Sequence, residues 1–162
     1  AVVPIPQLAW PSHGLAVVLD GLQDPGNAGT ILRTAWAAGA AAVATTRGTV
    51  DLYAPKVVRA AMGAHLHLPL RVGLDLDGLA LALRDRRVLL ADQRGMPYWE
   101  ANWRGDCALI IGGEARGPQV AAGLAAEGVG IPMAGGAESL NAAIAAAVLL
   151  FEAARQRPDP SA

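Results

Sequence analysis

This sequence has few cysteines, few aromatic residues and almost no net charge, and each of these limits what the protein can be. Cys107 is the only cysteine, which excludes a disulfide framework and a cysteine-based zinc site within one chain. Aromatic residues make up only 4% of the 162 residues and hydrophobic residues make up 53%, so the core must be aliphatic. The formal net charge of −1 lacks the basic excess that dominates non-specific nucleic-acid binding.

Long apolar runs, targeting signals and metal-ligand spacing are missing as well. A membrane span needs about 18 continuous apolar residues, whereas the alanine-rich stretch 142–150 has nine. No basic segment followed by a small-residue cleavage site opens the sequence. His13, His65 and His67 are not spaced as metal ligands, and we expect His65 and His67 to be ordinary surface or edge residues of a strand. We therefore expect a cytoplasmic protein with no membrane segment and no metal.

Short aliphatic runs alternate with helical stretches along the chain. The expected strands are 15–19, 41–45, 65–70, 88–91, 108–111 and 128–131, and the expected helices are 27–38, 54–62, 76–84, 118–126 and 139–155. Alternation of this kind, with almost continuously apolar strands, predicts an α/β fold with a mostly parallel sheet and helices on both faces. Asp75 is expected to cap the third of these helices.

The domain organisation is simple. Residues 15–157 are expected to form one domain, since the length suffices for one core and no internal repeat is present. The start, residues 1–14, is rich in proline and has no periodicity, which indicates a linker or a cut edge of a longer protein. Residues 158–162 are expected to form a tail.

Three polar or glycine-rich loops each follow an expected strand. Loop 20–27 leads into a helix that carries Arg33, with Asn27 as the expected N-cap. Loop 112–118 is not a phosphate loop, because Pro118 stands where such a loop needs lysine, and no dinucleotide-binding glycine pattern is present. Loop 131–141 leads into the last helix. Each loop alone could be a simple turn, but parallel sheets bind ligands where such loops gather, at the carboxyl ends of strands.

The loop residues resemble a known family in their order and spacing. Three segments resemble the three motifs of the SpoU, or TrmH-like, RNA ribose 2′-O-methyltransferases of the SPOUT superfamily: Asn27-Ala-Gly-Thr-Ile-Leu-Arg33, Ile111-Gly-Gly-Glu-Ala-Arg-Gly117 and Ile131-Pro-Met-Ala-Gly-Gly-Ala-Glu-Ser-Leu-Asn141. Segment 55–63 resembles a further family stretch, so the similarity covers nearly the whole chain. Two positions depart from the family pattern: Gly113 stands where Asn, Ser or Ala is usual, and Ala115 where Gly is frequent.

The resemblance implies a fold, a cofactor and an assembly. The fold would carry a SPOUT-type C-terminal trefoil knot, which patterning alone would not suggest because knots are rare. The cofactor would be S-adenosylmethionine, with no metal, and the assembly a homodimer with both active sites near the interface. Residues 1–14 would then be the remnant of a missing N-terminal RNA-binding domain. The RNA would be ribosomal rather than transfer RNA, because segment 19–27 resembles the two-domain ribosomal relatives.

The resemblance also implies roles for single residues. Gly112, Ile131 and Leu140 would contact the cofactor largely through backbone groups, with Met133 and Ala91 as weaker candidates on the same pocket wall. Arg33 would be the central catalytic residue, and four others would order the site: Asn27, Glu114, Ser139 and Asn141. Since arginine stays protonated in proteins, we hypothesise that Arg33 is no free base but binds an RNA phosphate and stabilises the developing alkoxide.

Other readings of the sequence stay open. The chain could be a transfer-RNA methyltransferase, a base-methylating relative, or a catalytically silent RNA-binding module of the same fold. An unrelated nucleotide or flavin binder would need a glycine fingerprint after the first strand, which is missing. Because the net charge is nearly neutral, we expect the domain to hold RNA weakly or locally and to be poorly active without an upstream domain.

Overall fold

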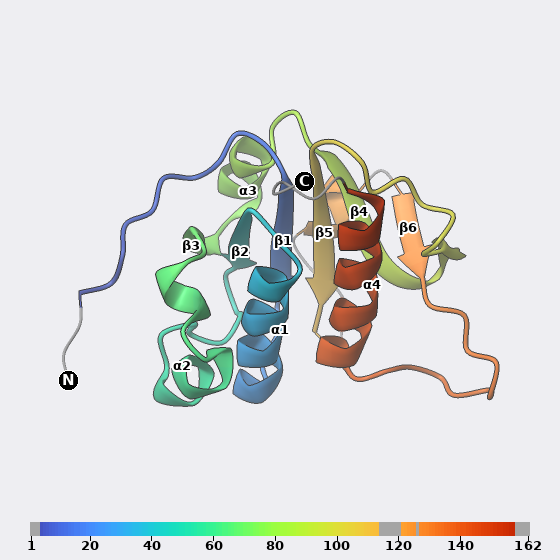
Figure 1. The fold of residues 1–162 in the computed structure, drawn as a ribbon, viewed down its shortest axis with the longest axis horizontal. Coiled ribbons are helices and arrows are strands. Elements are labelled where there is room, and N and C mark those ends of the chain that lie inside the picture. Colours follow the sequence, from blue (N-terminus) through green and yellow to red (C-terminus); the bar gives the residue numbers. More distant parts are fainter. Residues whose placement is uncertain (1–3, 114–120, 126, 158–162) are drawn as a thin grey trace.

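Within the described residues, six strands form one sheet through the middle of the molecule (Figure 1). The computed structural model describes residues 4–113, 121–125 and 127–157. The strand order is β3-β2-β1-β5-β4-β6, and every neighbouring pair is parallel. The strands are β1 (Leu15–Asp20), β2 (Ala42–Thr46), β3 (Leu70–Leu74), β4 (Arg87–Pro97), β5 (Cys107–Gly112) and β6 (Glu127–Gly130).

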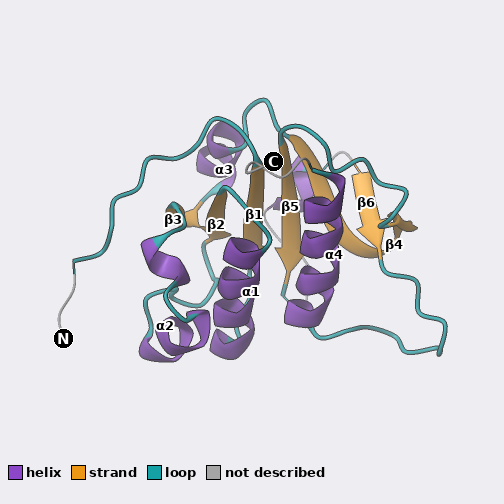
Figure 2. Cartoon of the chain, in the orientation of Figure 1, coloured by secondary structure: helices purple, strands orange, loops and turns teal. Residues whose placement is uncertain are grey.

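The helices cover both faces of this sheet (Figure 2). They are α1 (Pro25–Ala37), α2 (Pro55–Ala61), α3 (Leu76–Ala82) and α4 (Ala142–Gln156), with short 3-10 turns η1 (Ala64–Leu66) and η2 (Ala121–Leu124). Among the described residues, none of these helices has the combined length and hydropathy that crossing a bilayer would require.

Strand β1 lies at the centre of the sheet and shows why the fold has two apolar layers. All six of its residues are buried, and it pairs with β2 on one side and β5 on the other. Leu15, Val17 and Leu19 pack in one cluster with residues of α1, α2 and α4. Ala16 and Val18 face the other way, into a cluster that contains Leu79 of α3 and Ala121 of η2. The predicted α/β fold with helices on both faces is confirmed, whereas the knot stays a prediction.

The expected strand at 65–70 is wrong. The chain there forms η1, and β3 begins only at Leu70. Helix α2 ends at Ala61, and the next two residues, Met62 and Gly63, lie in the left-handed region with φ of 49° and 92°, which turns the chain sharply. His65 is consequently buried, with Nε2 2.7 Å from the Leu52 carbonyl oxygen. The alternation of His and Leu at 65–68 resembles a strand pattern but belongs to one tight turn.

Other elements differ in their bounds. The expected helix 118–126 lies in part outside the described residues, and within them the chain forms only the turn η2. Strand β4 extends to Pro97, and its pairing with β6 shifts register between Ala91 and Met96. Asp75 caps α3 as predicted, since its carboxylate accepts a hydrogen bond from the Gly78 amide at 3.0 Å.

Candidate active site

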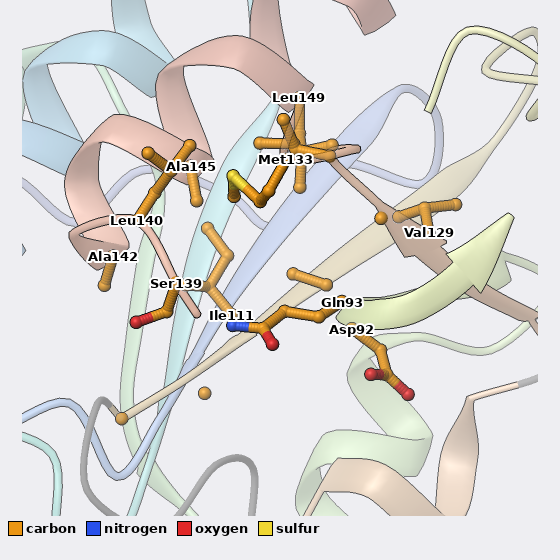
Figure 3. A pocket seen from close by; sticks show the side chains of 15 residues that line it. Asp92, Gln93, Ile111, Val129, Met133, Ser139, Leu140, Ala142, Ala145 and Leu149 are labelled. Atoms are coloured by element: carbon orange, nitrogen blue, oxygen red, sulfur yellow. The ribbon is translucent and has the colours of Figure 1, made fainter. Parts of the chain in front are cut away.

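A cavity of about 210 Å³ lies at the carboxyl ends of β5 and β6 and beside the middle of β4, against the first turns of α4 (Figure 3). Its wall consists of Ala91, Asp92, Gln93, Ile111, Gly112, Gly113, Val129, Gly130, Ile131, Met133, Ser139, Leu140, Ala142, Ala145 and Leu149. Carboxyl ends of parallel strands are where open α/β sheets bind ligands, because the connecting loops converge there.

All five residues predicted to contact a cofactor lie on this wall: Gly112, Ile131, Leu140, Met133 and Ala91. Strands β4, β5 and the end of β6 bring together segments that are far apart in sequence. Ser139, predicted as a site-ordering residue, lies on the same wall, and among the described residues Asp92 is the only charged one there. In Figure 3 the Gln93 carboxamide reaches toward Ile111 across the pocket, whereas the Asp92 carboxylate is directed away from the apolar side chains.

Asn27 and Asn141 form a direct hydrogen bond that joins the beginnings of α1 and α4. The Asn141 side-chain amide donates to Oδ1 of Asn27 at 3.0 Å, across 114 positions of sequence. The Oδ1 atom of Asn141 accepts from the Ala143 and Ile144 amides at 2.9 and 3.3 Å, which makes Asn141 the N-cap of α4. Asn141 therefore both caps the last helix and holds the side chain of Asn27 on the first.

The predicted N-cap of α1 was placed three residues too late. Asp24 caps the helix, and its Oδ1 accepts from the backbone amide of Asn27 at 2.7 Å. Pro25 occupies the first helical position, where its missing amide proton costs nothing. The pair Asp24-Pro25 was the signal in the sequence for the start of this helix. Asn27 lies inside the first turn, and its side chain accepts the hydrogen bond from Asn141.

Arg33 lies apart from the cavity. It is exposed on α1, six residues and thus about 9 Å along the helix axis from Asn27. None of the ion pairs among the described residues includes it, and it does not contribute to the cavity wall. Glu114, predicted to help order the site, lies outside the described residues. The fold thus brings Asn27 and Asn141 together next to Ser139 of the cavity wall. Arg33 is exposed to solvent and does not line the cavity.

Asp20 is a polar residue of this region that the sequence interpretation missed. It ends β1, is fully buried, and accepts hydrogen bonds from Thr46 Oγ1 at 2.6 Å and from the Ala121 amide at 2.8 Å. Its backbone carbonyl accepts from the Gly113 amide at 3.0 Å. Asp20 thereby holds both described ends of the segment between Gly113 and Ala121. A carboxylate directly after five apolar residues was the available signal.

Gly113 shows how tightly the ends of β1 and β5 approach. A Cβ atom at position 113 would lie 2.5 Å from the Gly21 carbonyl oxygen, closer than real Cβ contacts allow. The departure from the family pattern at this position therefore has a local physical reason: in this backbone, a side chain would push the two strand ends apart.

Comparisons with known proteins agree with this architecture. The sequence profile of the SpoU rRNA Methylase family matches residues 14–151. The 23S rRNA (guanosine(2553)-2'-O)-methyltransferase RlmP of Bacillus subtilis is 37% identical, over 93% of this chain and 62% of that protein. The mitochondrial rRNA methyltransferase 3 of Xenopus laevis is 33% identical, over 88% of this chain and 48% of that protein. The chain therefore spans about half to three fifths of the length of these relatives.

Solved structures give the same result. The SpoU methyltransferase AviRb from Streptomyces viridochromogenes in complex with AdoMet superposes with a TM-score of 0.78 at 35% identity, over 88% of this chain and 60% of that one. A structure described as giving insights into the 2-OH methylation of C/U34 on tRNA superposes with a TM-score of 0.79 at 35% identity, over 89% of this chain and 96% of that one.

Fold and site together define a class: a parallel α/β protein with a cavity at the strand ends, bordered by the segment leading into the last helix. Within that class the chain belongs to the SpoU rRNA Methylase family, whose profile covers most of its length.

Proposed function

We propose that this chain is the catalytic domain of an S-adenosylmethionine-dependent RNA methyltransferase that modifies a ribose 2′-hydroxyl, in ribosomal RNA. The observation that carries the proposal is the cavity at the start of α4, whose wall contains every residue predicted to contact the cofactor. Membership of the SpoU family, and relatives named as rRNA 2′-O-methyltransferases, support the RNA substrate.

The cavity wall suits an adenosylated, positively charged cofactor. Ile131, Met133 and Leu140 offer apolar surface for a flat ring, and main-chain groups at Gly112 and Ile131 are available for polar contacts. The Asp92 carboxylate is the one charge that the described residues bring to the wall, and its sign favours a cation. When bound, S-adenosylmethionine supplies an activated methyl group on sulfur. The protein then has to align the acceptor hydroxyl and to manage one proton.

Arg33 is proposed to act as a permanent cation. Its exposed guanidinium is free to hold an RNA phosphate in a bidentate fashion and to stabilise negative charge on the reacting ribose oxygen. The proton would leave to a phosphate or to water. Replacing Arg33 by lysine tests this role: most activity should be lost, whereas retention of activity would contradict a bidentate contact.

A homodimer is part of the proposal. Ile144 and Phe151 are each 54% exposed and lie seven residues apart on α4, so they share one face of the helix. Exposed aliphatic and aromatic side chains in such a stripe favour burial against a second copy. Light scattering on the purified chain should give twice the monomer mass, and a monomer at micromolar concentration would contradict it.

The cofactor is tested first by isothermal titration with S-adenosylmethionine and its demethylated product. We expect about one site per subunit, weakened about tenfold by Asn141→Ala, because that substitution removes both the α4 cap and the bond to Asn27. Asp75→Ala is the matched control, since it removes a helix cap far from the cavity. Absence of binding would overturn the proposal and favour a silent RNA-binding module.

The RNA class needs a separate experiment. Ribosomal RNA and transfer RNA lacking ribose methylation are each incubated with labelled cofactor, and the digested nucleosides are identified by mass spectrometry. A 2′-O-methylnucleoside from ribosomal RNA supports the proposal. Transfer RNA as the only substrate would favour the alternative, for which the neighbour described by tRNA methylation is the specific observation.

A further inference from the structure

The net charge of −1 conceals a strong separation of charge along the chain. Residues 25–71, which run from α1 to the start of β3, carry five basic residues and one acidic residue. The rest of the chain therefore holds eight of the 13 basic residues but 13 of the 14 acidic ones. The layer formed by α1, α2 and η1 is accordingly cationic on an otherwise acidic protein.

Three of these cations are exposed on neighbouring helices. Arg33 lies on α1, and Lys56 and Arg59 lie on α2. The other two, Arg47 and Arg71, have partners: Arg47 is 3.1 Å from the Asp75 carboxylate, and Arg71 lies over the Trp10 ring at 4.9 Å. Neither α1 nor α2 contains an acidic residue.

Trp36 of helix α1 lies on the same side of the molecule as these exposed cations. Gly29 packs so closely on α2 that a Cβ atom there would lie 2.5 Å from Cβ of Ala60. Arg33 and Trp36 follow Gly29 by four and seven positions, so they share its face of α1, the one turned toward α2 and η1. Trp36 is 41% exposed and stacks on His67, with ring centroids 4.2 Å apart and planes inclined by 6°.

Exposed cations around an exposed aromatic stack match the chemistry of single-stranded RNA. Phosphates are drawn to lysine and arginine, and unpaired bases stack on flat rings regardless of their sequence. A packed core does not need the Trp36–His67 pair, since both side chains are exposed. Arg33, the predicted catalytic residue, lies one turn before Trp36 on the same helix, which connects this surface to the reaction.

We propose that single-stranded RNA lies across the α1–α2 surface, defined by Arg33, Trp36, Lys56, Arg59 and His67, with one base stacked on the Trp36–His67 pair. This inference rests on the proposed RNA-modifying function and extends it, because it names the contact surface and an unpaired substrate. The cationic layer also attracts RNA phosphates locally, although the overall charge of the chain is close to zero.

The test measures binding of a fluorescein-labelled single-stranded RNA of mixed sequence, about 12 nucleotides long, by fluorescence anisotropy. Trp36→Ala should weaken binding about tenfold, the loss expected for one stacked base, and Trp36→Phe should restore most of it because it keeps a ring. Trp99→Ala is the matched control: Trp99 is 50% exposed and packs edge-on against Tyr98, but it lies outside the cationic layer.

The charges are tested in the same assay. Lys56→Glu combined with Arg59→Glu should weaken binding and flatten its dependence on salt, because two phosphate contacts are lost. Arg84→Glu, an exposed residue just beyond α3, should change neither. Equal effects of the surface and control variants, or no binding by the parent protein, would overturn the proposal.

Two further readouts separate this inference from the proposed function. If cofactor binding and methyl transfer occur but Trp36→Ala binds RNA like the parent, the surface is wrong and the function stands. If RNA binding depends on Trp36 while no cofactor binds, the function is wrong and the surface stands. A change of oligomeric state in Trp36→Ala would identify the surface as a contact between copies, which also overturns the proposal.

Discussion

Replacing Asp20 by asparagine should lower the free energy of unfolding by about 3 kcal/mol. The carboxylate is fully buried and accepts from Thr46 Oγ1 at 2.6 Å and from the Ala121 amide at 2.8 Å. Hydrogen bonds to a charged group contribute about 1.5–3 kcal/mol each, and an unsatisfied buried donor costs about 1–3 kcal/mol. Asparagine keeps one oxygen for one donor, but it turns an NH₂ group toward the other.

Urea unfolding measures this loss. With a slope of about 2 kcal/mol per molar urea, the midpoint should fall by roughly 1.5 M. Asp85→Asn is the control, because Asp85 is exposed and its left-handed backbone (φ 66°) also suits asparagine, so its midpoint should hardly move. Thr46→Val, which removes one donor and leaves the carboxylate, should fall between the two. Equal midpoints for the Asp20 and Asp85 variants would refute the assignment of Asp20 as the buried acceptor.

Three other substitutions follow from close contacts and charge. Gly29→Val should destabilise the chain by about 1–3 kcal/mol, because its side chain would collide with Ala60; urea unfolding measures this, and an unchanged midpoint would show that α1 and α2 are not so closely packed. Gly113→Ala should weaken cofactor binding in titration by displacing the cavity wall, and unaltered affinity would contradict the tight approach. The Arg155 side chain, by its hydrogen bonds, holds the pKa of Glu152 below its ordinary value. The parent should therefore exceed Glu152→Gln in stability at neutral pH and lose this advantage as pH falls below about 4.5 through the lowered pKa; a difference independent of pH would contradict it.

Most of the strands could be predicted from local sequence, whereas the cavity-wall residues were predicted from the resemblance of the loops to the family motifs. A strand buried on two faces is almost continuously apolar, as β1 and β5 are, so it is visible in the composition. Strand β4 lies between β5 and β6, so Ala91 of β4 shares one cavity with Gly112 at the end of β5 and Ile131 directly after β6. Their contact with a cofactor is still a prediction.

Features that depend on distant partners could not be predicted in this way. The position of β5 between β1 and β4 cannot be predicted from the hydrophobic periodicity of the sequence. The burial of His65 depends on a turn at Gly63 and on the Leu52 carbonyl, neither of which is encoded in the alternation at 65–68. Asp20 looked like a loop residue because its donors, Thr46 and Ala121, follow it by 26 and 101 positions.

The placement of β5 has a consequence for how the molecule matures. During vectorial synthesis, β1, β2 and β3 can pair early, but one edge of β1 stays open until residues 107–112 have emerged. The hydrogen bond that Asn27 Oδ1 accepts from Asn141 forms later still. A nascent chain therefore passes through a period with a half-built sheet and no cavity, and the cavity is completed late, when α4 docks.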